Sequence, residues 1–157
     1  MRQQFTKYGD SISFDLTFQL VKNRHFTSND RWKVGVFLGV SSCKHLVPLG
    51  IVLTLDQTAD TYVKIFRTFF EAVRGQPKLI ITDDEKAIGA ALREMKEKGS
   101  FMGSHRLDLY HVLHNLRKRL TNKGHILLFS RLAKARNDQE FQRRLDDIEE
   151  VLPISDK

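Results

Sequence analysis

The segment Ser11–Phe18, with the sequence SISFDLTF, alternates strictly between apolar and polar side chains. This period of two residues predicts a β-strand with one buried face. The polar residues, Asp15 among them, would lie on the opposite face. Because aspartate is uncommon in the middle of a strand, Asp15 is either a solvated charge on a half-exposed strand or a residue with a chemical role.

Two further strands are predicted soon afterwards, at Trp32–Val40 and Leu46–Leu55, where residues that favour β-structure are frequent. A polar loop is predicted for residues 22–31, and a turn for Ser41–Lys44. Such short connections indicate an antiparallel meander of three strands.

The period then changes to that of a helix, which begins at Thr58 or Thr61 and runs to about Val73. The stretch Lys78–Thr82 is apolar at its centre, which is typical of a parallel strand buried on both faces. The remaining predicted elements are a helix at Ala87–Lys98, a strand at Phe101–Leu109 and helices at Tyr110–Leu120, Ile126–Arg136 and Gln139–Leu152, with Gly124 as the break before the helix at Ile126.

This order of elements predicts an α/β fold: three antiparallel strands, then βα units, in a mixed sheet flanked by helices. It is the strand order of a ribonuclease H-like domain, although other α/β folds could supply it. The length of 157 residues predicts a single domain over 1–157.

The charge of the chain is unevenly distributed. Between Ser104 and Arg144, ten Lys and Arg residues stand against three acidic ones, and this stretch holds the whole net charge of +7. Such a basic balance favours a nucleic acid partner over a basic protein without one. No apolar run is long enough for a membrane span, and a single cysteine, Cys43, excludes an intramolecular disulfide and a zinc site of several cysteines.

Asp83 and Asp84 follow the predicted parallel strand directly. Either could cap the next helix. Alternatively, one is a metal ligand, because ligands of α/β sheets gather beyond the carboxyl ends of the strands. Together with Asp15 and a third acid from a late helix, such a site would select Mg²⁺ or Mn²⁺, and two ions would be expected for phosphodiester chemistry.

The predicted helix at Tyr110–Leu120 carries His111 and His114 one turn after Asp108. These three residues could bind zinc on one face, but histidines at this spacing are more often surface or phosphate-contacting groups. The run Arg117–Arg119 is a solvated face or, beside a nucleotidyl-transfer site, a set of phosphate contacts.

Several segments, taken in order, resemble the Mutator-like element (MULE) transposases, which are DDE-type enzymes with a ribonuclease H-like fold. Residues Pro77–Asp83 with Ala87 are similar to the family's Thr-Asp-x-x-x-Ala signature, and His105–Leu116 is similar to the block that the family closes with Cys-x-x-His. The other matching stretches are Phe14–Phe18, Val36–Val40, Leu46–Leu53 and Thr61–Val73. The resemblance covers about residues 10–120, and Asp108 stands where the family has its cysteine.

The resemblance implies that Asp15 and Asp83 are the first two catalytic, metal-binding acids. The third lies in a late helix, where Glu140 fits the family's acidic-Phe segment, with Glu149 and Glu150 as alternatives. The DNA-binding residues would be Arg106, His111, Arg117, Lys118 and Arg119.

The function that the resemblance implies is that of a transposase core that cleaves and transfers DNA strands with Mg²⁺ or Mn²⁺. The expected partner is double-stranded DNA, both transposon ends and target, and no membrane partner is expected. The protein could form a homo-oligomer, and in a eukaryote it would be located in the nucleus. The replacement of the family cysteine by Asp108 leaves open a domesticated DNA-binding or regulatory domain without catalysis. A third hypothesis is a stand-alone ribonuclease H-type nuclease, but such an enzyme would not need the basic stretch Ser104–Arg144. The chain would be an excised core of a longer protein.

Overall fold

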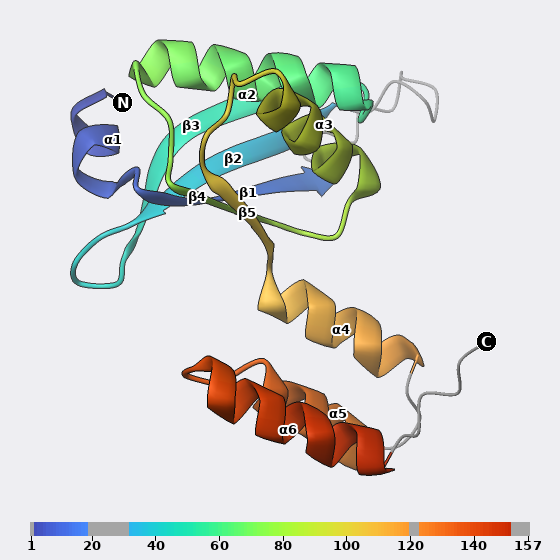
Figure 1. Cartoon of the computed structure of the whole chain (residues 1–157). Helices are drawn as coiled ribbons and strands as arrows, with labels where there is room; N and C mark the ends of the chain where they lie inside the picture. Colours follow the sequence, from blue (N-terminus) through green and yellow to red (C-terminus); the bar gives the residue numbers. More distant parts are fainter. Residues whose placement is uncertain (1, 19–31, 120–122, 152–157) are drawn as a thin grey trace. The chain divides into compact units, whose positions relative to one another are not determined.

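The alternating segment Ser11–Phe18 forms the central strand, β1, of a five-stranded sheet (Figure 1). The structure is a computed structural model that describes residues 2–18, 32–119 and 123–151. The chain divides into two units, which we call the core unit, Met1–Asp108, and the helical unit, Leu109–Lys157. The loop predicted for residues 22–31 lies outside the described residues.

The sheet of the core unit is mixed. Strand β1 pairs antiparallel with β2 (Lys33–Val40), which pairs antiparallel with β3 (Leu46–Thr54). On its other side, β1 pairs parallel with β4 (Leu79–Thr82), and β4 pairs parallel with β5 (Ser104–Leu107). The resulting order, β3-β2-β1-β4-β5, is that of a ribonuclease H-like sheet. The predicted fold class is therefore confirmed.

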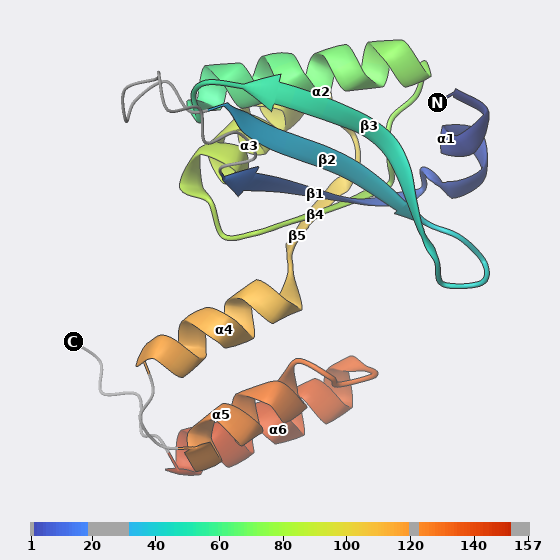
Figure 2. The same cartoon turned by 180° about the vertical axis from the view of Figure 1, so that it is seen from behind.

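Two helices of the core unit, α2 (Ala59–Val73) and α3 (Lys86–Glu97), cover one face of the sheet. Figure 1 shows α3 in front of the strands, and Figure 2 shows the strands in front of α3. The hydrophobic core lies between these layers and is rich in aromatic rings; Phe37 and Phe69 stack with their centroids 3.9 Å apart. Gly35 makes room for this packing, because a Cβ atom there would come within 2.8 Å of the Phe14 ring.

The opposite face of the sheet carries Asp15, Val36 and Ile51 at paired positions of β1, β2 and β3. Asp15 and Ile51 are exposed and Val36 is half-buried, whereas Ile12 and Phe14, on the helix side of β1, are almost completely buried. The alternation predicted for the first strand therefore separates a buried face from an open one.

The helical unit contains α4 (Leu109–Arg119), α5 (Lys123–Leu132) and α6 (Asp138–Val151). Helix α5 packs against both α4 and α6, and Ile148 of α6 is buried. No helix among the described residues is long and apolar enough to cross a membrane.

The structure differs from the predicted elements in three places. Helix α1 (Arg2–Tyr8) was not predicted; it is fixed by tertiary packing, since the Phe5 ring meets the edge of Phe69 with centroids 5.9 Å apart. Gly124 lies within α5, which begins earlier and ends earlier than predicted. Strand β5 is limited to the four residues that pair with β4.

Candidate functional site

The two predicted catalytic aspartates each follow directly after one residue of the last pair that joins β1 and β4. Phe14 of β1 pairs with Thr82 of β4. The residue after Phe14 is Asp15, and the residue after Thr82 is Asp83. Neighbouring strands lie about 4.8 Å apart, so the fold places Asp83, just past the end of β4, close to Asp15 in the middle of β1. Asp15 is exposed and Asp83 is half-buried.

The segment after β4 reaches α3 without using either aspartate as its cap. The N-cap of α3 is Glu85, which makes no side-chain capping bond. Asp84 is exposed. The N-cap position is thus neither Asp83 nor Asp84, and the alternative in which one of them caps this helix is wrong.

A group of hydrogen-bonded side chains lies beside Asp83, and we call it the strand-end cluster: Lys33, Gln57, Tyr62 and Glu85. The Tyr62 hydroxyl donates to Glu85 Oε2 at 2.7 Å, and Gln57 Nε2 donates to the same oxygen at 3.3 Å. Lys33 Nζ in turn donates to Gln57 Oε1 at 2.7 Å. The cluster joins the start of β2, the β3–α2 loop, α2 and the start of α3, because all of these meet at the same end of the strands.

The electrostatics of the strand-end cluster follow from partial burial. Burial is the main cause that raises the pKa of the Glu85 carboxyl, and the nearby charge of Asp83 raises it further. Burial, followed by the hydrogen bond to Glu85, raises the pKa of the Tyr62 hydroxyl far above its ordinary value. Tyr62 therefore stays protonated and donates, and Glu85 is held as the acceptor.

Thr82, the last residue of β4, is fixed from the β5 side. Its hydroxyl lies 2.9 Å from His105 Nε2, and its carbonyl accepts from the Asp108 N–H at 2.6 Å. Burial lowers the pKa of His105, and the positive charge of Arg106 lowers it further. A neutral imidazole therefore partners the threonine immediately before Asp83.

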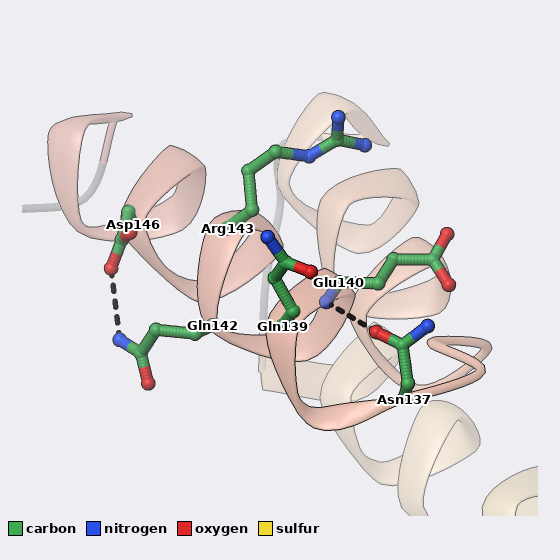
Figure 3. Close-up of a pocket in the computed structure, with 6 residues that line it drawn as sticks. All are labelled: Asn137, Gln139, Glu140, Gln142, Arg143 and Asp146. Atoms are coloured by element: carbon green, nitrogen blue, oxygen red, sulfur yellow. Dashed lines mark hydrogen bonds between the residues drawn. The ribbon is translucent and has the colours of Figure 1, made fainter.

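The proposed third acid, Glu140, is engaged at the start of α6 (Figure 3). Its carboxylate accepts from the Arg136 N–H at 2.8 Å and forms an ion pair with Arg144. Its own N–H donates to Asn137 Oδ1 at 2.8 Å, as Figure 3 shows. The backbone hydrogen bond is the main cause that lowers the pKa of Glu140. Asn137 thus caps the helix, and the Glu140 side chain reaches back to the N–H just before the cap, an arrangement close to a capping box.

An open pocket of about 690 Å³ lies beside this cap, lined by polar side chains that include Glu140 and Arg143. Figure 3 shows these side chains, with Gln142 bonded to Asp146 along the helix at 2.9 Å. The predicted alternatives Glu149 and Glu150 are exposed on the last turns of α6. The role of a third acid stays a prediction for all three glutamates.

The predicted DNA-binding residues lie on two elements. Arg106 is exposed on β5, and His111, Arg117, Lys118 and Arg119 belong to α4. Arg117 and Lys118 are exposed, whereas His111 is half-buried.

The aromatic Tyr110 lies at the start of α4 and is exposed. Its ring stacks on His114 with centroids 6.1 Å apart. Across the parts of the chain that the structure describes, no group of three or more His, Cys, Asp or Glu side chains could hold a metal ion. The zinc set of Asp108, His111 and His114 is therefore not assembled.

The residues missed by sequence reasoning are those of the strand-end cluster. Glu85 lies two residues after Asp83, and Gln57 directly precedes the N-cap of α2, Thr58. Both residues follow strands that end on the same side of the sheet, so the predicted strand order could have indicated that their polar side chains lie near Asp83. Tyr62 carried none, because an aromatic residue in an apolar helical stripe predicts only core.

No protein-family model matches the sequence. The chain is 29% identical over 150 residues to Protein FAR-RED IMPAIRED RESPONSE 1 of Arabidopsis thaliana. The matched region covers 91% of this chain and 17% of that protein. It is 28% identical over 149 residues to Protein FAR1-RELATED SEQUENCE 4 of the same plant, covering 90% of this chain and 19% of that protein. The chain thus spans less than a fifth of the length of either of these curated relatives.

Among solved structures, the chain is similar to the HTLV-2 integrase catalytic core domain in complex with magnesium, with a TM-score of 0.43 and 13% identity over 86% of this chain and 81% of that one. It is also similar to a chain in the simian T-cell lymphotropic virus intasome in complex with PP2A regulatory subunit B56 gamma, with a TM-score of 0.45 and 12% identity over 86% of this chain and 46% of that one.

Proposed function

We propose that this chain is a DNA-acting domain of transposase descent that cleaves phosphodiester bonds with a divalent cation at Asp15 and Asp83. The observation that supports this proposal is the pairing of Phe14 with Thr82, which puts Asp83, just past the end of β4, close to Asp15 in the middle of β1. Two carboxylates at such a position form the kind of oxygen donor set that Mg²⁺ and Mn²⁺ prefer.

In this function Asp15 and Asp83 hold the cation, while Glu140 as the third acid stays a prediction that rests on the family resemblance. When bound, one or two such ions activate a water or hydroxyl and stabilise the leaving oxygen of the phosphodiester. The hydrogen bonds around Thr82 keep the end of β4, directly before Asp83, in place. The exposed cations Arg106, Arg117 and Lys118 would contact the DNA backbone. The protein would act in the nucleus of a eukaryote, and a homo-oligomer would bring two DNA ends together.

A second candidate is a domesticated DNA-binding or regulatory domain without catalysis. The engagement of Glu140 with Arg144 and Arg136 supports it, because a carboxylate used as a helix cap is less available to a metal ion. The relatives in Arabidopsis thaliana also support it, since the first is named for an impaired far-red response and not for an enzymatic activity.

Nicking of supercoiled plasmid DNA in the presence of Mg²⁺ or Mn²⁺ separates the two candidates. We expect the wild-type chain to nick DNA, and Asp83→Asn to lower the rate by about a hundredfold or more, since it weakens electrostatic stabilisation at the reacting centre. Asp84→Asn is the matched control, because Asp84 is the exposed neighbour with the same charge, and it should retain the activity. Equal loss in both variants would contradict the assignment of Asp83.

The Glu140→Gln variant tests the third acid in the same assay. Abolished nicking with unchanged DNA binding would support a catalytic role for Glu140, whereas full activity would transfer that role to Glu149 or Glu150 or remove it. A wild-type chain that binds DNA but never nicks it would favour the regulatory domain.

A further inference from the structure

An apolar groove runs between the outer strand of the sheet, β3, and helix α2, and we call it the β3–α2 groove. Its volume is about 320 Å³. Its base is formed by Phe37, Ile65 and Phe69, all buried or nearly so. Gly50 of β3 contributes no side chain, and the Phe69 ring packs directly against it, since a Cβ atom there would lie 3.2 Å from that ring.

One wall of the groove is the edge of the sheet. In the sheet that the described residues form, β3 is a terminal strand, and a terminal strand directs half of its backbone N–H and C=O groups away from its partner. Its second half, Gly50–Thr54, contains no charged residue and no proline, the usual devices that keep a strand edge from pairing. Ile51 and Leu53 also remain 69% and 63% exposed.

The other wall is an exposed row along α2, formed by Lys64, Thr68 and Ala72. Lys64 is the one cation among the lining residues of this groove. The groove therefore has backbone hydrogen-bonding groups along its β3 wall, an apolar base, and a positive charge on its α2 wall.

We propose that the β3–α2 groove binds an extended acidic peptide segment of a partner protein, which adds a strand to the edge of β3. Strand addition supplies main-chain hydrogen bonds, and pockets beside the edge select alternate side chains of the peptide. The apolar base accepts side chains that point towards α2, and Lys64 favours an acidic side chain on that same face. This inference is independent of metal binding and of DNA cleavage.

The proposal is tested by titrating the ¹⁵N-labelled chain with two synthetic heptapeptides. Each has threonine at its odd positions and valine at its second and sixth positions, so that alternate residues face the groove; the central residue is glutamate in one and lysine in the other. We expect the glutamate peptide to shift the amide signals of β3 and α2 and to bind about two- to fivefold more tightly than the lysine peptide, the range of an exposed ion pair.

Two substitutions of the same kind distinguish Lys64 from the overall charge. Lys64→Glu should reverse the preference between the two peptides. Arg67→Glu, at an exposed position of α2 outside the groove, changes the net charge equally and should leave the preference as it is. Thr68→Trp, which fills the groove from its exposed wall, should abolish the binding of both peptides.

Three outcomes would overturn the proposal: shifts that map outside β3 and α2, equal effects of Lys64→Glu and Arg67→Glu, or unchanged binding by Thr68→Trp. Concentration-dependent shifts of the β3 signals without any peptide would also overturn it, because a second copy of the chain would then be the occupant.

Discussion

Glu85 makes the stability of the core unit depend on pH in a predictable direction. Burial raises the pKa of this carboxyl above its ordinary value of 4.5, so the folded chain binds the proton more tightly than the unfolded chain does. The free energy of unfolding should therefore fall as the pH rises from about 4.5 through the raised pKa. Glu85→Gln keeps an oxygen that accepts from Tyr62 and Gln57 but carries no charge, so this loss should disappear in the variant.

Urea denaturation between about pH 4 and about pH 7 measures the effect, with the difference between wild type and variant growing through this interval. Glu71→Gln is the control, because Glu71 is exposed on α2 and should leave the pH profile as in the wild type. Parallel profiles for wild type and Glu85→Gln would show that the strand-end cluster does not raise the pKa of this carboxyl.

At the level of single residues, the sequence predicted those candidate site residues whose position depends on a single strand. Asp15 was marked by the alternation of Ser11–Phe18, and Asp83 by its position after an apolar strand. The strand-end cluster could not be found in this way, because its four members come from four segments that meet only after the sheet has formed.

Among the elements, α6 depends on the cap at its first turn. Asn137 Oδ1 accepts from the Glu140 N–H at 2.8 Å, which satisfies one of the free donors of the helix. Asn137→Ala removes this acceptor and should lower the free energy of unfolding of the helical unit by about 1 kcal/mol.

Amide hydrogen exchange along α6, together with urea denaturation, would measure this loss. Gln139→Ala is the matched control, since Gln139 is exposed in the same turn and alanine is at least as good a helix former. A loss of the same size in both variants would contradict a specific role for the cap.

The elements themselves were predictable to within a few residues wherever a clear period was present. Helix α2 was predicted to begin at Thr58 or Thr61, and Thr58 is its N-cap, with an oxygen that accepts from the Thr61 N–H at 3.3 Å. Helix α1 was missed because its seven residues contain a single buried side chain, Phe5, and one residue makes no period. Gly124 was misread as a break because a glycine in the first turn of a helix has the same sequence signal as one outside it.

For the whole molecule, the concentration of positive charge predicts a strong dependence of DNA binding on salt. Each phosphate contact that releases a counterion contributes about 0.9 to the slope of log K against log salt. Replacing Arg117, Lys118 and Arg119 together by alanine should therefore reduce the magnitude of that slope by about 2.7. Fluorescence anisotropy with a labelled DNA duplex at several salt concentrations would measure it.

The matched control removes three cations of the core unit, Lys7, Arg67 and Lys96, which are exposed and lie outside the basic stretch. Both triple variants have the same net charge, so a difference in slope reports the position of the charges and not their sum. If DNA is held by α4, only the first variant changes the slope. Equal changes in both variants would mean that the field of the whole chain attracts DNA without a defined site, and no change in either would mean that the residues of α4 form a solvated face. Because these slopes are measured without a divalent cation, they decide how DNA is held independently of whether Asp15 and Asp83 cleave it.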